Sequence, residues 1–346
     1  MLLFCVSTER KEVTLNHLVK LEKVIPRGLR PFIKRRVLDS SWFSSLYRSG
    51  IRREVRRIEQ EDFKPLIVYI ETTNVCNAKC IMCPREEMTR NLGIMSMDLH
   101  QKIVDQCAEM KIPEVRLHNV GEPLLDKQIP QKIKYAKEKG IPKVLMYTNA
   151  SLLDKRLSEE IIFAGLDEMF ISFDAAEKET YEAIRKGLDF DRVSKGIETF
   201  LEVRAAAGQK KPKVHFAYTC MDLNRQEVHK FKSRWRDRVD SIGIFDVCDW
   251  ADQKRVDSEI YRFKKKWPCA YLWKTMFILW NGDVSICCLD FNGKVTFGNA
   301  GKESIIKIWK NEPFRRAREL HLGGKFNHIP LCAQCTLNRW WFQYEE

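Results

Sequence analysis

The stretch PLIVYIETTNVCNAKCIMCPRE, residues 65–86, joins a short apolar run to a loop that carries three cysteines. Its first part, 65–72, is apolar and rich in β-branched residues, which predicts a buried strand. Cys76, Cys80 and Cys83 follow at once. Three thiolates on one tight loop can hold a metal, but they complete neither a tetrahedral site nor all corners of a four-iron cubane. The loop therefore raises the question of the fourth ligand.

Five further apolar runs follow the first strand, and most are separated from the next by one helical stretch. We expect strands at 114–120, 143–149, 168–174, 213–220 and 241–247, and helices at 96–110, 126–139, 154–165, 177–207 and 225–237. Alternating strands and helices predict parallel pairing with right-handed crossovers. Six such units predict an α/β fold, a partial (β/α)6 TIM-like barrel. Its chemistry should lie at the carboxyl ends of the strands, where the cysteine loop falls.

The pattern changes after residue 250. Residues 267–299 read as short strands joined by Asn-Gly turns, which are a strong hairpin signal. A helix is expected at 303–320, and the chain then reaches a CxxC pair at 332–335. We interpret this part as a small C-terminal α+β iron–sulfur module. The expected organisation is a basic, helical N-terminal segment (1–63), a barrel (64–248) and the module (249–346).

The twelve cysteines are many for a chain of 346 residues. A disulfide framework is typical of small secreted domains, whereas clustered cysteines in a large chain indicate metal binding. The N-terminus lacks the basic start of a secretory signal and reaches charged residues by position 9. No uninterrupted run of about 18 apolar residues is present, which predicts no transmembrane helix. We therefore expect a cytoplasmic protein.

The net charge of +13 is concentrated near the N-terminus, where residues 1–64 hold 15 Lys/Arg and 8 Asp/Glu. The runs at 30–36 and 51–59 are the most basic. A solvated helix face is the simplest interpretation. The alternatives are contact with an acidic partner or peripheral contact with an anionic membrane surface through residues 1–63. Nucleic-acid binding is disfavoured because no nucleic-acid motif accompanies the charge.

The cysteine loop, placed after an apolar strand on a six-unit βα scaffold, resembles that of the radical S-adenosylmethionine (radical SAM) superfamily. The resemblance implies a [4Fe–4S] cluster held by Cys76, Cys80 and Cys83, with S-adenosylmethionine (SAM) on the open iron. It also implies that a 5′-deoxyadenosyl radical abstracts a substrate hydrogen, and that a flavodoxin- or ferredoxin-type protein supplies the electron.

Further family-like motifs stand at the ends of the next three expected strands. The resemblance assigns SAM contacts to Gly121, Glu122 and Pro123 after the second, Asn149 after the third and Ser172 after the fourth, with Arg185 on the following helix as a partner for the SAM carboxylate. The family often has a second glycine before Gly121, where this sequence has Val120.

The downstream cysteines form a second frame, Cys269-x12-Gly282-x4-Cys287 followed by Cys332-x2-Cys335. It resembles the "twitch" module, a shortened SPASM domain. The resemblance implies one auxiliary [4Fe–4S] cluster on these four cysteines, which makes two clusters in all. A four-cysteine zinc site is the alternative. We expect Cys288 not to be a ligand.

The resemblance favours hydrogen abstraction from a hydroxylated small molecule, such as a sugar, an aminocyclitol or a nucleotide-linked sugar. The product would be a ketone or an epimer. Epimerisation needs a thiol donor, for which Cys248 and Cys220 are candidates, and Asp246 is a candidate base. Both cysteines also fit simple packing roles. The other hypotheses are peptide modification, nucleic-acid modification and a non-catalytic iron–sulfur protein.

Overall fold

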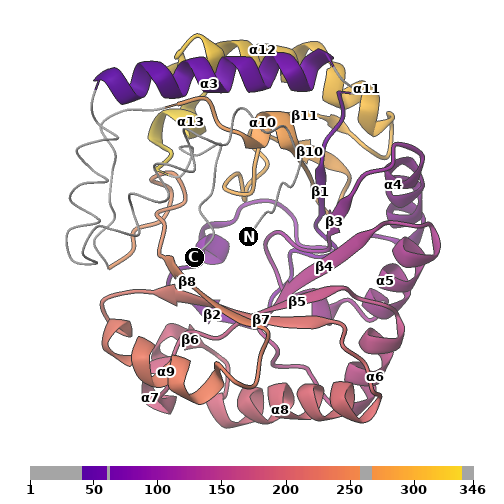
Figure 1. Cartoon of the computed structure of the whole chain (residues 1–346), viewed down its shortest axis with the longest axis vertical. Coiled ribbons are helices and arrows are strands. Elements are labelled where there is room, and N and C mark those ends of the chain that lie inside the picture. The colour runs from indigo at the N-terminus through magenta and orange to yellow at the C-terminus, as the bar shows by residue number, and fades with distance from the viewer. Residues whose placement is uncertain (1–40, 61–62, 258–266, 337–346) are drawn as a thin grey trace, which may run out of the picture.

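The computed structural model describes residues 41–60, 63–257 and 267–336. Its strands form an open arc with helices outside it (Figure 1). The order of the nine-stranded sheet is β11-β10-β9-β1-β3-β4-β5-β7-β8. The six strands from β1 to β8 in this order are parallel throughout. The expected α/β partial barrel is therefore confirmed.

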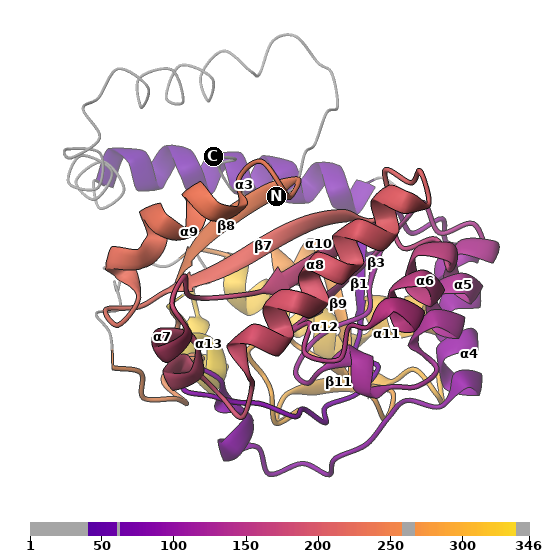
Figure 2. The same cartoon turned by 90° about the horizontal axis from the view of Figure 1, so that it is seen from below.

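The barrel strands lie close to the positions that the sequence predicts. They are β1 (Ile67–Ile70), β3 (Glu114–Arg116), β4 (Lys143–Thr148), β5 (Glu168–Ser172), β7 (Lys213–Cys220) and β8 (Ser241–Asp246). The helices that cover their outer side are α4 (Met97–Glu109), α5 (Ile129–Glu138), α6 (Lys155–Phe163), α8 (Phe190–Ala206) and α9 (Val228–Trp235) (Figures 1 and 2).

The two faces of the sheet have different composition. Successive side chains on a strand point to opposite faces. Val68, Val115 and Met146 face the helices and are fully buried in the main core. The alternate positions, such as Tyr69 and Tyr147, face the inside of the arc, which we call the lumen. The lumen face therefore carries aromatic and polar groups on these strands, whereas these outward positions are apolar.

The C-terminal module extends the barrel sheet and is not a separate layer. Its strands are β9 (Thr275–Ile278), β10 (Asp283–Ser285) and β11 (Thr296–Asn299). β9 pairs parallel with β1 along four residues, and β10 pairs antiparallel with β9 across the Asn281–Gly282 turn. The sequence predicts the hairpin but not its docking. A six-strand barrel leaves the edge of β1 unpaired, and β9 covers that edge.

Two expected helices are interrupted. The stretch 177–207 contains α7 (Lys178–Ile184), the two-residue strand β6 (Arg185–Lys186) and then α8. Gly187, with φ +88°, turns the chain, and Asp189 caps the start of α8. The stretch 303–320 contains α11 (Ile305–Lys310) and α12 (Glu312–Leu322), separated at Asn311.

The remaining elements are short. They are β2 (Lys79–Cys80), α10 (Tyr271–Lys274), α13 (Pro330–Gln334) and the 3-10 turns at Pro84–Glu87, Pro123–Leu125, Arg225–Glu227 and Phe326–His328. β2 pairs antiparallel with β6, which places the cysteine loop against the end of α7.

The N-terminal segment includes one described helix, α3 (Ser41–Gln60). Ile51 and Val55 are buried on one side, and Arg52, Arg53 and Arg56 are exposed. The basic run 51–59 is thus the solvated face of an amphipathic helix, whereas the run 30–36 lies outside the described residues. None of the described helices is long and apolar enough to cross a membrane.

Candidate active site

The first cysteine loop is held against β6 at the carboxyl side of the barrel. Cys80 pairs with Arg185 in the β2–β6 ribbon, and the Ile81 amide donates to the Ile184 carbonyl at 3.0 Å. Cys76, Cys80 and Cys83 form no disulfide and are partly exposed. Burial raises the pKa of the Cys76 thiol to about 11 and that of Cys83 to about 12. The loop therefore presents three shielded thiols from one rigid ribbon.

Arg185 is committed to protein partners. Its Nε donates to Asp174 Oδ2 at 2.7 Å, its Nη2 lies 2.5 Å from the same oxygen, and its Nη1 lies 3.6 Å from the Cys80 sulfur. Burial alone would lower the pKa of the guanidinium, but the interaction with Asp174 raises it above its ordinary value. In this geometry the Arg185 guanidinium contacts the cysteine loop. These contacts use several of its N–H donors, which leaves fewer of them for the carboxylate of SAM.

Glu122 connects the ends of two neighbouring strands. Its carboxylate accepts hydrogen bonds from the Thr148 hydroxyl at 2.6 Å, the Asn149 amide at 2.7 Å and the Leu124 amide at 3.1 Å. Burial raises its pKa, and these donors oppose the effect. The side chain is 1% exposed. Glu122 therefore ties the Gly121–Pro123 turn to the end of β4.

Asn149 continues this link to the cysteine loop. Its side-chain Nδ2 donates to Asn77 Oδ1 at 3.0 Å, and Asn77 Nδ2 in turn donates to the Ser151 hydroxyl at 2.8 Å. Asn77 lies between the first two cysteines. Ser172 ends β5, where it pairs in register with Ala217 of β7. The structure thus brings the motifs after β3 and β4 to the cysteine loop.

The downstream cysteines gather into a second buried group. Burial raises the pKa of the Cys287 thiol, and the neighbouring thiols of Cys288, Cys332, Cys335 and Cys269 act in the same direction. They therefore lie near one another, although 44 residues separate the hairpin from the CxxC pair.

Cys248 belongs to this second group. Burial raises its pKa, and Asp249 and Cys335 add to the effect. Cys248 and Cys288 pack around the same small core, which contains Ala251, Leu289 and Cys335. The second group thus contains six cysteines, whereas four ligands are enough to complete a cluster.

The donor set of both groups consists of cysteine thiols. All the cysteines named above are free of disulfides. Among the described residues, no three or more histidine, cysteine or carboxylate side chains are gathered closely enough to hold one metal ion. Thiolates are ligands both of structural zinc and of iron–sulfur clusters.

Cys220 and Asp246 lie away from the lumen. They are paired in the register of β7 and β8. Cys220 shares a strand face with Phe216 and Tyr218, whose rings pack against Phe231 of α9. The sequence predicts Cys220, Asp246 and Cys248 near the catalytic face. The structure pairs Cys220 with Asp246, and the period of two along β7 turns Cys220 toward the helices.

The lumen contains functional candidates that the motifs do not indicate. His118, Tyr147, Phe170 and His215 stack across four successive strands or strand ends, with ring centroids 4.9, 4.5 and 4.7 Å apart and planes within 28°. Tyr69 stacks in the same way on Phe277, at 4.6 Å. The signal in the sequence is the aromatic residue at alternate strand positions, which also fits ordinary core packing.

Arg116 supplies a positive charge on the lumen face. Its Nη1 donates to the Tyr69 hydroxyl at 2.6 Å, and its Nε pairs with Glu114 at 2.5 Å. Burial lowers the pKa of the nearby His118 to about 4, and the charge of Arg116 adds to the effect. The His118 imidazole is therefore neutral at neutral pH, and its Nδ1 is buried without a hydrogen-bond partner in the described part of the chain.

Cys288 connects the second cysteine group with the lumen. Burial raises the pKa of the Tyr271 hydroxyl, and the nearby Cys288 thiol raises it further. Cys288 also acts to raise the pKa of Tyr69 and of Tyr147, each of which burial raises most. Its thiol therefore lies on the lumen side of the second group.

A partial barrel with one cysteine group at its strand ends and a second in a docked module defines a class of iron–sulfur enzymes. The sequence model of the radical SAM superfamily matches residues 70–231, and that of the SPASM iron–sulfur cluster-binding domain matches residues 269–336. The chain therefore belongs to the radical SAM superfamily and has a C-terminal SPASM/twitch-type cluster domain. Its cofactors are SAM, the [4Fe–4S] cluster that binds SAM, and an auxiliary cluster.

Curated relatives match part of the chain. A probable GTP 3′,8-cyclase of Methanococcus maripaludis is 34% identical over 135 residues, which is 39% of this chain and 45% of the relative. The GTP 3′,8-cyclase of Chlorobaculum tepidum is 32% identical over 135 residues, which is 39% of this chain and 40% of the relative. The match thus spans less than half the length of these relatives.

Solved structures share the fold over most of the chain. BtrN in complex with AdoMet and 2-DOIA has a TM-score of 0.55 at 18% identity and covers 78% of this chain and 92% of its own. SuiB of Streptococcus suis bound to its precursor peptide SuiA has a TM-score of 0.63 at 15% identity, with 83% and 75% covered. At these identities the similarity is one of fold alone.

Proposed function

We propose that this radical SAM enzyme abstracts a hydrogen atom from a hydroxylated small molecule, such as a sugar, an aminocyclitol or a nucleotide-linked sugar, and gives a ketone or an epimer. When bound, SAM and its cluster supply the 5′-deoxyadenosyl radical for this abstraction. The protein's part is to hold the substrate in the lumen, exclude water and handle the proton.

The observation that best supports this proposal is the stacking of the aromatic rings in the lumen. Tyr147 is stacked on both of its faces, by His118 and by Phe170. A ring whose faces are covered cannot stack on a flat ligand, and it offers only its edge and polar tip. Strand side chains stand roughly perpendicular to the sheet, so these tips project into the lumen. The wall therefore offers hydroxyl and imidazole groups, which suit a ligand rich in hydroxyls.

Several of these polar groups can still form hydrogen bonds with a ligand. The Tyr147 hydroxyl makes no hydrogen bond to any other described residue, and His118 Nδ1 is unpartnered. Arg116 fixes the Tyr69 hydroxyl and adds a positive charge that suits a substrate bearing a phosphate. In an oxidation, neutral His118 would accept the hydroxyl proton of the substrate. In an epimerisation, Cys288 or the neighbouring Cys248 would return a hydrogen atom.

The cofactor ligands are proposed on the same geometry. Cys76, Cys80 and Cys83 would hold the SAM cluster, and Ser172 and the Gly121–Pro123 turn would contact SAM. The auxiliary ligands would be Cys269, Cys287, Cys332 and Cys335. An external one-electron donor of the flavodoxin or ferredoxin type would reduce the enzyme. We assign no catalytic role to Cys220 or Asp246, which lie on the helix side of the sheet.

The structural neighbours support two substrate classes. The BtrN structure is a complex with the small molecule 2-DOIA, and the SuiB structure is a complex with a precursor peptide. The hydroxyl-rich wall favours the first. Modification of a peptide is the second candidate, and cyclisation of a purine nucleotide, suggested by the names of the curated relatives, is the third.

The test is substrate-dependent SAM cleavage by the reconstituted full chain. Enzyme, SAM and a chemical reductant are incubated with sugar phosphates, nucleotide-linked sugars, aminocyclitols, a peptide library and GTP, and 5′-deoxyadenosine is measured. We expect stimulation by a hydroxylated small molecule and none by the matched deoxy analogue. Turnover with peptides or GTP, and with none of the hydroxylated compounds, would contradict the proposal.

A further inference from the structure

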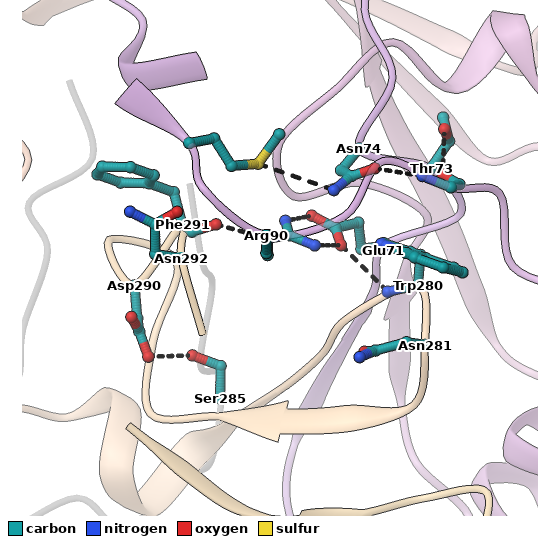
Figure 3. A network of polar contacts seen from close by, with 12 residues as sticks. Glu71, Thr73, Asn74, Arg90, Trp280, Asn281, Ser285, Asp290, Phe291 and Asn292 are labelled. Atoms are coloured by element: carbon teal, nitrogen blue, oxygen red, sulfur yellow. Dashed lines mark hydrogen bonds and ion pairs between the residues drawn. The ribbon is translucent and has the colours of Figure 1, made fainter. Parts of the chain in front are cut away.

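Residues 84–93, which we call the strap, connect the first cysteine loop to α4 by a route across the C-terminal module. The strap contains the 3-10 turn Pro84–Glu87 and is otherwise irregular. It contacts Trp280 before β10, and Phe291 and Asn292 in the loop after β10 (Figure 3). The strap therefore joins the loop of one proposed cluster to the loop that follows Cys287.

The centre of this contact is a buried ion pair between Arg90 of the strap and Glu71 at the end of β1. Arg90 Nη1 donates to Glu71 Oε2 at 2.7 Å, and Nη2 donates to Oε1. The Glu71 side chain is fully buried, and the Trp280 amide also donates to its Oε2, at 3.1 Å. The third donor of the fork, Arg90 Nε, reaches the Phe291 carbonyl at 2.6 Å. One guanidinium thus ties β1 to the module loop.

Flanking hydrogen bonds keep the strap in register. The Thr89 amide donates to Asn292 Oδ1 at 2.7 Å, and Trp280 Nε1 donates to the Asn91 carbonyl at 3.1 Å. Asn74, two residues before Cys76, donates to the same Asn91 carbonyl at 2.8 Å. The strap is therefore held by Asn74, before the cysteine loop, and by the C-terminal module.

A second connection reaches the same module loop from the other side of the cysteine loop. Trp250 Nε1 donates to the Met82 carbonyl, next to Cys83, at 2.9 Å. Its ring meets Phe291 edge-on at 6.2 Å. Phe291 lies four residues after Cys287. Both connections converge on Phe291, so the two cysteine groups are held through one shared residue.

We propose that the Glu71–Arg90 pair is a positioning element that fixes the spacing between the SAM cluster and the auxiliary cluster. The inference rests on the proposed cluster ligands. Arginine suits this role because its planar fork makes all three bonds at once, whereas lysine offers a single point charge. Burial shields the pair from salt and water, so the spacing stays fixed in solution.

The test compares variants of the full chain after anaerobic reconstitution of both clusters. Arg90→Lys keeps the charge but loses the fork. The double variant Glu71→Gln/Arg90→Met leaves no buried charge unpaired and also loses the bond to Phe291. Arg238→Met is the control, because Arg238 pairs with Glu198 at the surface, with side chains 42% and 37% exposed. Iron and sulfide content and circular dichroism establish that each protein is loaded and folded.

The readout is the magnetic interaction between the two reduced clusters in the presence of SAM, measured by power saturation in electron paramagnetic resonance. In the wild type and in Arg238→Met, we expect the auxiliary cluster to speed relaxation of the SAM-cluster signal. In Arg90→Lys and in the double variant, both signals should persist, and the faster relaxation should be lost or become heterogeneous.

Unchanged relaxation in both loaded variants would overturn the inference and leave the proposed function intact. Loss of a cluster from both variants would also overturn it, because the pair would then serve cluster binding and not spacing. A loaded wild type with only one cluster would overturn the inference together with the ligand assignment.

Discussion

Gly121 shows how one residue fixes the turn after β3. Its φ is +113°, and an added Cβ would lie 2.4 Å from the Thr73 carbonyl oxygen. Gly140 is a matched control, because its φ is also positive, at +83°, but an added Cβ there meets nothing within 4 Å. The two positions therefore separate backbone strain from steric overlap.

Gly121→Ala should destabilise the protein more than Gly140→Ala does. Strain from an unfavourable φ costs about 1–3 kcal/mol at either site, and the clash with Thr73 adds to it only at Gly121. The free energy of unfolding in urea and the affinity for SAM are the measurements. We expect Gly140→Ala to retain SAM binding and Gly121→Ala to lose it. Equal effects of the two substitutions on both measurements would refute the assignment.

His100 gives the stability of the protein a pH dependence. It is fully buried on α4, and its Nε2 contacts the Lys132 carbonyl at 3.1 Å. Burial lowers its pKa to about 3, and Lys132 contributes in the same direction. As the pH falls below about 6.5, the unfolded state takes up a proton that the folded state does not, so stability falls with pH.

His100→Gln should reduce the loss of stability between about pH 6.5 and pH 4, where each pH unit costs about 1.4 kcal/mol per such histidine. The free energy of unfolding is measured across this range for both proteins. His328→Gln is the control, because His328 is exposed at the end of the 3-10 turn Phe326–His328. The same pH slope in His100→Gln and wild type would exclude His100 as the source.

At the scale of elements, Glu122 joins the turn after β3 to the end of β4 through two donors, and it accepts from a third, the Leu124 amide, within its own turn. In Glu122→Gln, the new amide group would face donors and could not accept from them. An unsatisfied buried donor costs about 1–3 kcal/mol. We expect this loss in unfolding free energy and weaker binding of SAM, measured by equilibrium titration.

Glu138→Gln is the control for that substitution, since Glu138 forms an exposed pair with Lys134 in which both side chains are more than half exposed. Such pairs contribute little to stability. Comparable losses in Glu122→Gln and Glu138→Gln would show that the link between strand ends does not matter.

The strands and the first cysteine loop could be predicted because their signals are local. An apolar run such as 65–72 and the spacing of Cys76, Cys80 and Cys83 are readable in the sequence alone. The break between α7 and α8 could not be predicted in the same way. Arg185 and Lys186 leave the helix to pair with Cys80 and Lys79, about a hundred residues away, and no local propensity records such a partner.

The lumen residues escaped prediction for a related reason. Arg116, His118 and Tyr147 have no motif, and their roles arise only when parallel strands align them. Arg90 is equally silent in the sequence, although its partners Glu71 and Phe291 define the contact between barrel and module. Long-range contacts, not composition, decide these positions.

At the scale of the whole molecule, the barrel and the module share one sheet. β9 continues the hydrogen-bond ladder of β1, and residues of both parts belong to one hydrophobic core. Val284 on β10 and Val144 on β4 are both fully buried in it. Parts that share a sheet and a core should unfold as one cooperative unit, unlike domains joined by a linker.

Val284→Ala tests this expectation from the module side. The lost side-chain volume should cost about 1–3 kcal/mol, and cooperative unfolding should pass that cost to the barrel. Native-state hydrogen exchange is the measurement, with peptides from β4 and β5 reporting on the barrel. Their most protected amides should exchange faster by the same free energy as those of β9. If β9 and β10 lose protection while β4 and β5 keep the wild-type rates, the module unfolds independently, and the shared sheet does not couple the two cysteine groups.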